Sequence, residues 1–443
     1  MALSGGGLAT GSKPKKPYIA LTSRFMQAKR IGIHQASPFP QCQRRVKHAV
    51  LASVPGDFGC KQIAHFLYNF LLPQWHALKM KGWLGNRSGL VLFLDCTGKL
   101  YSSETTREDR VRFGGVPLAK APGFVSEAVR VLGVAAVEPL SLPGLRAAET
   151  SPICFDHVLV GSQCAQLDQY NRNMVKPTGS NINNELADEF VRWRDLLIAS
   201  VLRKVVSPPF SSQHPAAKQT WLPWALTQTP RGGSVHSSTS NGFTSSARDG
   251  RLAVLLVDRR SSRRWLNVAH VASAVERLDG VRSARVVRFE GLSLAEQMRQ
   301  VRDVDVLMGV DGSGLANGNW LRNGSFVIDL VPYLNAVVRP DLSNNFRRMW
   351  HMLGVQVLTS HATRVETDLP EYVDRLIPWC RRCLFSGALR TTKGVTSTSK
   401  CEVSLGQAMW CLDMQDTNVS LARALSLVRT VLQVGRTLPQ KLK

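Results

Sequence analysis

The chain has 443 residues, of which 44% are hydrophobic and 20% charged, a balance typical of globular proteins and ample for two or three domains. This composition excludes a largely disordered chain, and no stretch reaches the roughly eighteen apolar residues of a transmembrane helix. Lysine and arginine total 56 against 32 acidic residues, so the net charge of +24 favours anionic partners: nucleic acid, anionic membranes or phosphorylated small molecules.

The first fifth of the chain divides into a basic part and a structured part. Residues 1–48 are basic and polar, and we expect an irregular leader there. Residues 60–83 carry apolar side chains at helical spacing, with Pro73 bending or ending the first helix. The apolar run at 89–98 is bounded by glycines, which is typical of a strand buried on both faces.

The following elements continue this alternation of strands and helices. We expect a helix at 123–133, a strand at 155–162 and a long amphipathic helix at 183–206. Strands that alternate with helices predict a parallel α/β sheet. Residues 207–250 are rich in Ser, Pro, Thr and Gly, so we interpret them as a flexible linker or long loop between two halves.

The second half shows the clearer pattern. The helix at 293–304 begins with a capping box of Ser293 and Glu296. Residues 386–443 form a tail that ends in a helix around 418–436. The series is of the nucleotide-binding β-α-β type, with strands at 251–259, 284–291, 305–310 and 325–332 and helices at 267–278, 293–304 and 314–324.

A glycine turn lies between the third of these strands and its helix. The turn runs from Gly309 to Leu315 as G-V-D-G-S-G-L, and such turns direct backbone N–H groups and a helix N-terminus toward the end of the sheet. Gly312 and Gly314 let the backbone approach an anion closely. The turn lacks a Walker lysine, and Asp311 is an unexplained acid within it. We interpret it as a phosphate cradle; a simple tight connection is the alternative.

An arginine-rich segment, D-R-R-S-S-R-R-W-L-N at 258–267, ends the first strand of this half. Parallel strands share their carboxyl edge, so its four arginines lie on the same rim as the glycine turn. Arginine binds phosphate oxygens through two parallel hydrogen bonds. The alternative is a solvated charge run.

These motifs together resemble those of glycosyltransferase family 61, which includes plant β-1,2-xylosyltransferases and the EGF-domain O-GlcNAc transferase. Residues 64–75 and 154–161 add weaker similarity, and the resemblance covers roughly 60–385. The block at 258–332 carries it, through R-R-x-x-x-R-x-L-N, S-L-x-E-Q, D-V-L-x-G-x-x-G-x-G-L and V-I-D-L-V-P in that order.

The resemblance implies a GT-B-like α/β fold in which two Rossmann-like domains face a cleft. The N-terminal, acceptor-side domain is expected at 49–206 and the nucleotide-sugar-binding domain at 251–385. It further implies an inverting enzyme that needs no metal or other cofactor and transfers a pentose or N-acetylhexosamine from a UDP-sugar. The implied acceptor is a glycan or glycoprotein.

The resemblance also assigns site residues. His65 is the candidate general base, with Asp95 and Asp156 as alternatives. Asn267 is expected to cap the following helix, and Glu296, beside the matching Gln297, is expected to be structural. Asp329 accepts the ribose hydroxyls or caps local backbone. The residues expected to bind the donor phosphates are Arg259, Arg260 and Arg264 and the turn residues Asp311, Gly312, Ser313, Gly314 and Leu315.

Two departures from the family pattern leave a second hypothesis open. Asn69 stands where the family commonly has aspartate, and Asp311 where it has histidine. The alternative is therefore a degenerate member that binds nucleotide or glycan without turnover. Nucleic acid is not the partner we expect, because the chain has no known reading motif and its aromatic residues are not interleaved with the basic runs. The family implies a Golgi or ER lumenal location and a membrane anchor, of which this sequence shows no segment.

Overall fold

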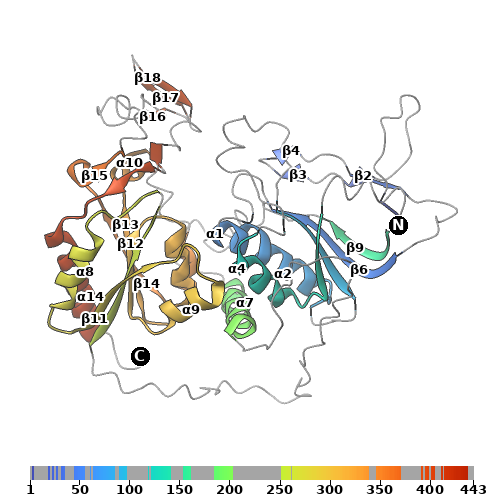
Figure 1. The fold of residues 1–443 in the computed structure, drawn as a ribbon, viewed down its shortest axis with the longest axis horizontal. Coiled ribbons are helices and arrows are strands. Elements are labelled where there is room, and N and C mark those ends of the chain that lie inside the picture. The colour runs from blue at the N-terminus through green and yellow to red at the C-terminus, as the bar shows by residue number, and fades with distance from the viewer. Residues whose placement is uncertain are drawn as a thin grey trace. The chain divides into compact units, whose positions relative to one another are not determined.

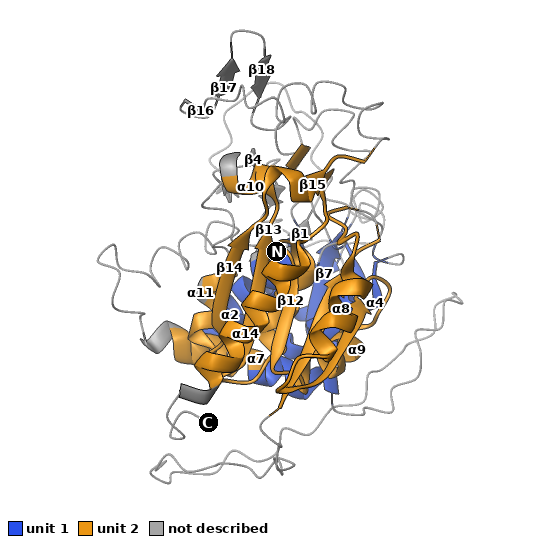
Figure 2. Ribbon diagram, turned by 90° about the vertical axis from the view of Figure 1, so that its left-hand side faces the viewer, with its two compact units in different colours: residues 1–186, 195–238 blue, residues 187–194, 239–443 orange. Residues whose placement is uncertain are grey.

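The computed structural model (Figure 1) divides into two compact units, residues 1–186 with 195–238 and residues 187–194 with 239–443 (Figure 2). The linker predicted at 207–250 lies outside the described residues. None of the helices among the described residues is long and apolar enough to span a membrane. The structure describes residues 2–3, 18–19, 22–23, 26–27, 31–34, 44–54, 60, 63–84, 89–96, 118, 121–140, 153–160, 184–202, 251–260, 262–338, 346–370, 391–392, 395–398, 401–404, 411–412 and 414–437.

The first unit is built on a sheet whose four principal strands are parallel. β6 (Arg44–Ser53) lies between β9 (Ile153–Val160) and β7 (Leu90–Asp95), and β8 (Ala136–Pro139) follows β7. Every residue of β7 is buried, as the continuous apolar run predicts. Short strands complete the unit: β1 (Ala2–Leu3), β2 (Tyr18–Ile19) and β5 (Ile31–His34) extend the sheet beyond β9 in antiparallel orientation, and β3 (Thr22–Ser23) pairs with β4 (Met26–Gln27).

β6 begins within the leader that the sequence predicts to be irregular. Its first half reads R-R-V-K-H, in which the basic residues are largely exposed and Val46 is buried. The charges conceal the alternation that marks a strand with one solvated face. Ala49, Val50 and Leu51 then lie in the core, so β6 is a central strand of this sheet.

A continuous helical segment precedes β7. It consists of α1 (Ile63–His65), the π-helix η2 (Phe66–Leu71) and α2 (Leu72–Met80). Pro73 lies in the first turn of α2, directly after the wider π-helical turns. Since proline has no N–H to donate to the preceding turn, the π-helix accommodates it and the chain continues as a helix beyond Pro73.

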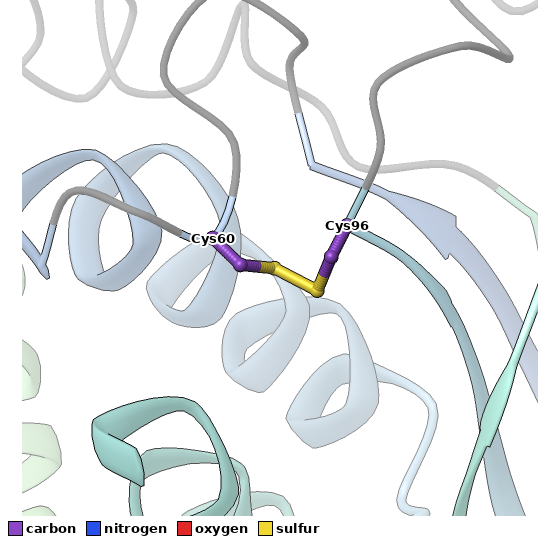
Figure 3. The surroundings of a disulfide bond; sticks show 2 residues. All are labelled: Cys60 and Cys96. Atoms are coloured by element: carbon purple, nitrogen blue, oxygen red, sulfur yellow. A yellow bond between two sulfur atoms is a disulfide. The ribbon is translucent and has the colours of Figure 1, made fainter. Parts of the chain in front are cut away.

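A disulfide between Cys60 and Cys96 joins the start of this segment to the end of β7 (Figure 3). Cys154 and Cys411 are disulfide-bonded as well. Two further helical elements follow the predicted pattern: α4 (Gly123–Ala128) with η4 (Val129–Leu132), and α7 (Asn184–Leu202). α7 buries Phe190, Trp193, Leu197 and Val201, which recur at the spacing of one helix face.

The second unit contains a sheet of five parallel strands in the order β11-β10-β12-β13-β14. β10 and β12, the first and third strands of this unit along the chain, are therefore neighbours in the sheet. The connections that follow them run toward opposite edges of the sheet. This is a doubly wound order, with its switch point between β10 and β12. The strands are β10 (Leu252–Asp258), β11 (Val281–Arg288), β12 (Val306–Val310), β13 (Phe326–Val331) and β14 (Gln356–His361).

Helices cover both faces of this sheet (Figure 1). α8 (Val268–Glu276) and α14 (Leu421–Thr437) pack on one face, around residues such as Leu256, Met308 and Ile328. α14 corresponds to the helix predicted at 418–436, and Ala424, Val428 and Val431 place it in the core of this unit. The remaining elements are α9 (Leu294–Arg302), η5 (Ser313–Trp320), α10 (Tyr333–Val338), α11 (Arg347–Met352), η7 (Arg364–Glu366), β15 (Thr367–Asp368), β16 (Thr391–Thr392), β17 (Val395–Thr398), β18 (Cys401–Ser404) and β19 (Asp416–Thr417).

The two parallel sheets, of four and five strands, confirm the α/β class and are consistent with two Rossmann-like domains. The cleft of a GT-B protein stays a prediction.

Candidate functional site

The candidate site lies at the carboxyl ends of β10 and β12. Val257 of β10 is opposite Gly309 of β12 in the parallel register, so the segments that leave these two strands start side by side. In doubly wound sheets the ligand lies at this switch point, where the diverging connections leave room for it. The arginine-rich segment and the glycine turn are those two connections.

Gly312 has a backbone conformation that residues other than glycine rarely adopt, with φ +150° and ψ −175°. A Cβ placed on it would lie 2.3 Å from Nη1 of Arg259 and 3.1 Å from Cζ of Arg263. The sequence predicts that this glycine leaves room for an anion. In the structure, the arginines themselves occupy the space beside it, so Gly312 is what lets the two guanidinium groups lie against the turn.

Gly314 and Leu315 serve the packing beneath the turn. A Cβ on Gly314 would lie 3.0 Å from Cγ1 of Val257, and Leu315 is buried with its Cδ2 beside Gly309. Ser313 is partly exposed and begins η5, which is a 3₁₀ helix in place of the expected α-helix. The turn is therefore held firmly on the end of the sheet.

Arg263 is the arginine that meets the acid of the turn. Its Nη1 lies 3.7 Å from Oδ2 of Asp311, and both side chains are mostly buried. Its backbone has φ +52°, in the left-handed region that non-glycine residues rarely adopt. The family motif has no fixed residue at this position, so the only sequence signal for Arg263 was its membership of the four-arginine run.

Arg260 and Arg264 are both predicted to bind donor phosphate, but in the structure they have partners elsewhere in the unit. The Arg264 guanidinium and backbone N–H both bond to the buried carboxylate of Asp416, at 2.9 Å from Nε and 2.9 Å from N. Arg260 is exposed, and its backbone N–H donates to Glu290 at 3.2 Å. Of the three predicted arginines, Arg259 lies against the glycine turn at Gly312.

Asp329 extends this cluster of charges into the protein. It lies on β13, opposite Gly309 on one side and Thr359 on the other, and is 1% exposed. Burial, and next the charge of Asp311, raise the pKa of Asp329 well above that of an ordinary carboxyl, while Arg347 and Arg263 lower it in part. The raised pKa favours the uncharged form of this carboxyl, and its Oδ1 has no hydrogen-bond partner among the described residues.

Three other motif residues hold the scaffold together. The capping box of Ser293 and Glu296 is confirmed, and hydrogen bonds from Ser293 lower the pKa of Glu296. Gln297 donates to Leu292 O at 3.0 Å and accepts a bond from Asn317 at 3.1 Å, which ties α9 to η5.

The expectation that Asn267 caps α8 with its side chain is wrong. It occupies the position before the helix, but its side chain makes no capping bond there. The amide donates to Val419 O at 2.8 Å and accepts from Trp265 Nε1 at 3.0 Å. Asn267 therefore holds the C-terminal segment instead of the helix end.

The candidate bases belong to the first unit. His65 lies in α1 and Asn69 in η2, but their side chains are outside the part of the chain that the structure describes. Asp95 ends β7, at the carboxyl edge where ligands of parallel sheets bind, and is buried. Asp156 lies within β9, away from that edge, and pairs with Arg45 at 2.7 Å.

Among the described residues, no group of three or more His, Cys, Asp or Glu side chains is arranged to hold a metal ion. A doubly wound sheet with arginines packed on a glycine turn at its switch point is an α/β arrangement of the Rossmann-like class. The Glycosyltransferase 61 family model matches residues 63–328, more than half of the chain, so the protein belongs to this family and is a glycosyltransferase. A search of curated proteins found no match.

Proposed function

We propose that the enzyme transfers a sugar, a pentose or an N-acetylhexosamine, from a UDP-sugar to a hydroxyl of a glycan or glycoprotein, with inversion and without a metal. The observation that carries this proposal is the packing of Arg259 and Arg263 on Gly312 at the switch point of the sheet. Two guanidinium groups beside a glycine turn suit the diphosphate of a nucleotide sugar.

The proposed reaction is a single displacement. The acceptor oxygen forms a bond to the anomeric carbon while the bond from that carbon to the phosphate oxygen breaks, and UDP leaves with the electron pair. A base takes the hydroxyl proton, and His65 is the candidate, with Asp95 as the alternative. Arg259 and Arg263 stabilise the charge that develops on the diphosphate, as positioned donors do in other transferases.

Asp311 is compatible with this role because its charge is countered locally. Arg263 pairs with it, Arg259 lies on the adjacent Gly312, and the raised pKa of the neighbouring Asp329 favours the uncharged form of that carboxyl. Among these described groups the positive charge exceeds the negative one. This surplus supports diphosphate binding, which the active enzyme and the binding-only alternative both require. Membership of the family favours the active enzyme.

A lumenal location in the Golgi or ER is part of the proposal. Disulfides persist in oxidising compartments, and the Cys60–Cys96 bond joins two elements of the first unit (Figure 3). The family resemblance points to the same compartments.

Calorimetry with UDP, followed by a screen of UDP-sugars for donor hydrolysis, tests the proposal. We expect saturable UDP binding that Arg263→Ala weakens at least tenfold. Arg277→Ala is the charge-matched control, because Arg277 is exposed at the end of α8, where its Nη1 donates to Ser273 Oγ at 2.8 Å.

The outcomes separate the alternatives. No heat with any nucleoside diphosphate overturns the proposal. UDP binding without hydrolysis or transfer of any sugar supports the binding-only alternative, and Asp311→His then tests whether the family's histidine restores turnover.

A further inference from the structure

The arginine-rich segment is attached to a part of the chain about 150 residues later. Trp265 pairs with Thr417 as an isolated bridge, in which Thr417 N donates to Arg264 O at 2.8 Å and Leu266 N donates to Thr417 O at 2.9 Å. Asn267 adds its bond to Val419 O. The segment 416–419, which contains β19, therefore fixes the second half of the arginine segment.

Asp416 makes the strongest of these attachments. It is 2% exposed, and its carboxylate accepts the backbone N–H of Arg264 through Oδ1 and the guanidinium through Oδ2. A charged carboxylate that accepts both a backbone and a guanidinium donor forms strong, directional bonds. It fixes the backbone of Arg264 as well as its side chain.

The first half of the segment is fixed separately. Asp258, at the end of β10, accepts the N–H of Arg259 at 2.8 Å and Nε of Arg288 at 2.6 Å. Arg263 lies along the chain between Arg259 and Arg264, the residues that Asp258 and Asp416 bind. Its left-handed backbone is unfavourable for a residue with a side chain and persists only when its surroundings hold it. The neighbouring bond of Arg264 to Asp416 is therefore positioned to maintain the orientation of Arg263.

We propose that Asp416 is a positioning residue for donor binding: it holds the arginine segment in the conformation that directs Arg259 and Arg263 onto Gly312. The inference rests on the proposed function, because it takes the two arginines as donor-phosphate ligands. Arg264, by its pairing with Asp416, transmits this effect and is not itself a phosphate ligand.

The substitution Asp416→Asn distinguishes two possible roles of Arg264: direct binding of the donor phosphate, and pairing with Asp416 that positions the arginine segment. If Arg264 bound phosphate directly, removal of the Asp416 charge would leave its guanidinium more available, and UDP would bind equally well or more tightly. If Asp416 acts by position, the loss of its charged bonds releases the segment, and we expect UDP to bind about tenfold or more weakly.

Glu366→Gln is the matched control. Glu366 is also buried, at 7% exposure, and its carboxylate accepts the N–H groups of Thr363 and Ser420 and pairs with Arg423 at 3.1 Å. Its side chain secures the same C-terminal region through these partners, which lie outside the arginine segment. We expect Glu366→Gln to lower the melting temperature as Asp416→Asn does, while the UDP dissociation constant stays within about twofold.

The double variant Arg264→Gln with Asp416→Asn supplies a rescue that a purely structural role would not give. Two amides of similar shape can hydrogen-bond to each other, so we expect UDP affinity to recover relative to either single variant. A double variant no better than Arg264→Gln alone, or equal affinity of wild type and Asp416→Asn, overturns the inference. Absence of UDP binding in the wild type instead overturns the proposed function, so the two failures are distinguishable.

Discussion

Replacement of Gly312 by alanine is the sharpest test of the arginine and glycine arrangement. The new Cβ would lie 2.3 Å from Nη1 of Arg259, far closer than non-bonded atoms approach, and 3.1 Å from Cζ of Arg263. The φ of +150° also belongs to a region that is essentially restricted to glycine. Alanine at this position must therefore displace Arg259, shift the turn, or both.

The structure sets the expected magnitude. Backbone strain of this kind costs about 1–3 kcal/mol of folding free energy. Displacement of Arg259 removes a charged hydrogen bond to the donor phosphate, and such bonds contribute about 1.5–3 kcal/mol. A loss of this size weakens UDP binding by roughly 10-fold to 150-fold, since each 1.4 kcal/mol is about tenfold in the dissociation constant.

The assay is calorimetry with UDP, with thermal unfolding of the same variants in parallel. Gly314→Ala is the matched control, because its Cβ would meet Cγ1 of Val257 at 3.0 Å and no arginine. We expect both variants to unfold at lower temperature and only Gly312→Ala to lose UDP affinity. Unchanged affinity in Gly312→Ala, or an equal loss in Gly314→Ala, would refute the argument that Gly312 serves the arginines.

Three further predictions concern the arginines of the segment, the buried Asp329 and the disulfide. Arg263→Ala is expected to weaken UDP binding more than Arg260→Ala in calorimetry, because Arg260 is exposed and Arg263 faces the turn; the reverse order would contradict the assignment. Because the pKa of Asp329 is raised in the folded state, this carboxyl destabilises the fold increasingly as the pH rises above about 4, where it ionises in the unfolded chain. Thermal unfolding should therefore show Asp329→Asn to be stabilising at pH 7 and nearly neutral at pH 4, and a loss of stability at both pH values would disprove the point. Cys60→Ser with Cys96→Ser opens a closed loop of 36 residues and is expected to reduce the free energy of unfolding in denaturant titrations by about 3–4 kcal/mol, whereas an unchanged value would exclude a stabilising role.

The α/β class and most elements of the second unit could be predicted from the sequence because they depend on local patterns. Buried parallel strands are continuous apolar runs, and β10, β12 and β13 show them clearly. The capping box of Ser293 and Glu296 spans four residues, so it also could be recognised directly.

The elements that were missed or altered depend on more distant neighbours. The basic first half of β6 forms a strand because β9 pairs with it, which its own composition does not reveal. Pro73 lies within a helical segment because a π-helix precedes it. In β6 the pairing with a distant strand overrides the local preference, whereas at Pro73 the adjoining π-helix does so.

The candidate site shows the same division at the level of single residues. The sequence by itself determined that an arginine-rich segment and a glycine turn end parallel strands, and hence that they share one edge of the sheet. Only the tertiary structure decided which arginine serves which purpose. Arg264, which matches the family motif, is paired with Asp416, about 150 residues away, whereas Arg263 lies against Gly312 and Asp311. The positions of the strands along the chain follow from short-range patterns of burial, but the direction of each side chain depends on partners that folding brings together from distant parts of the chain.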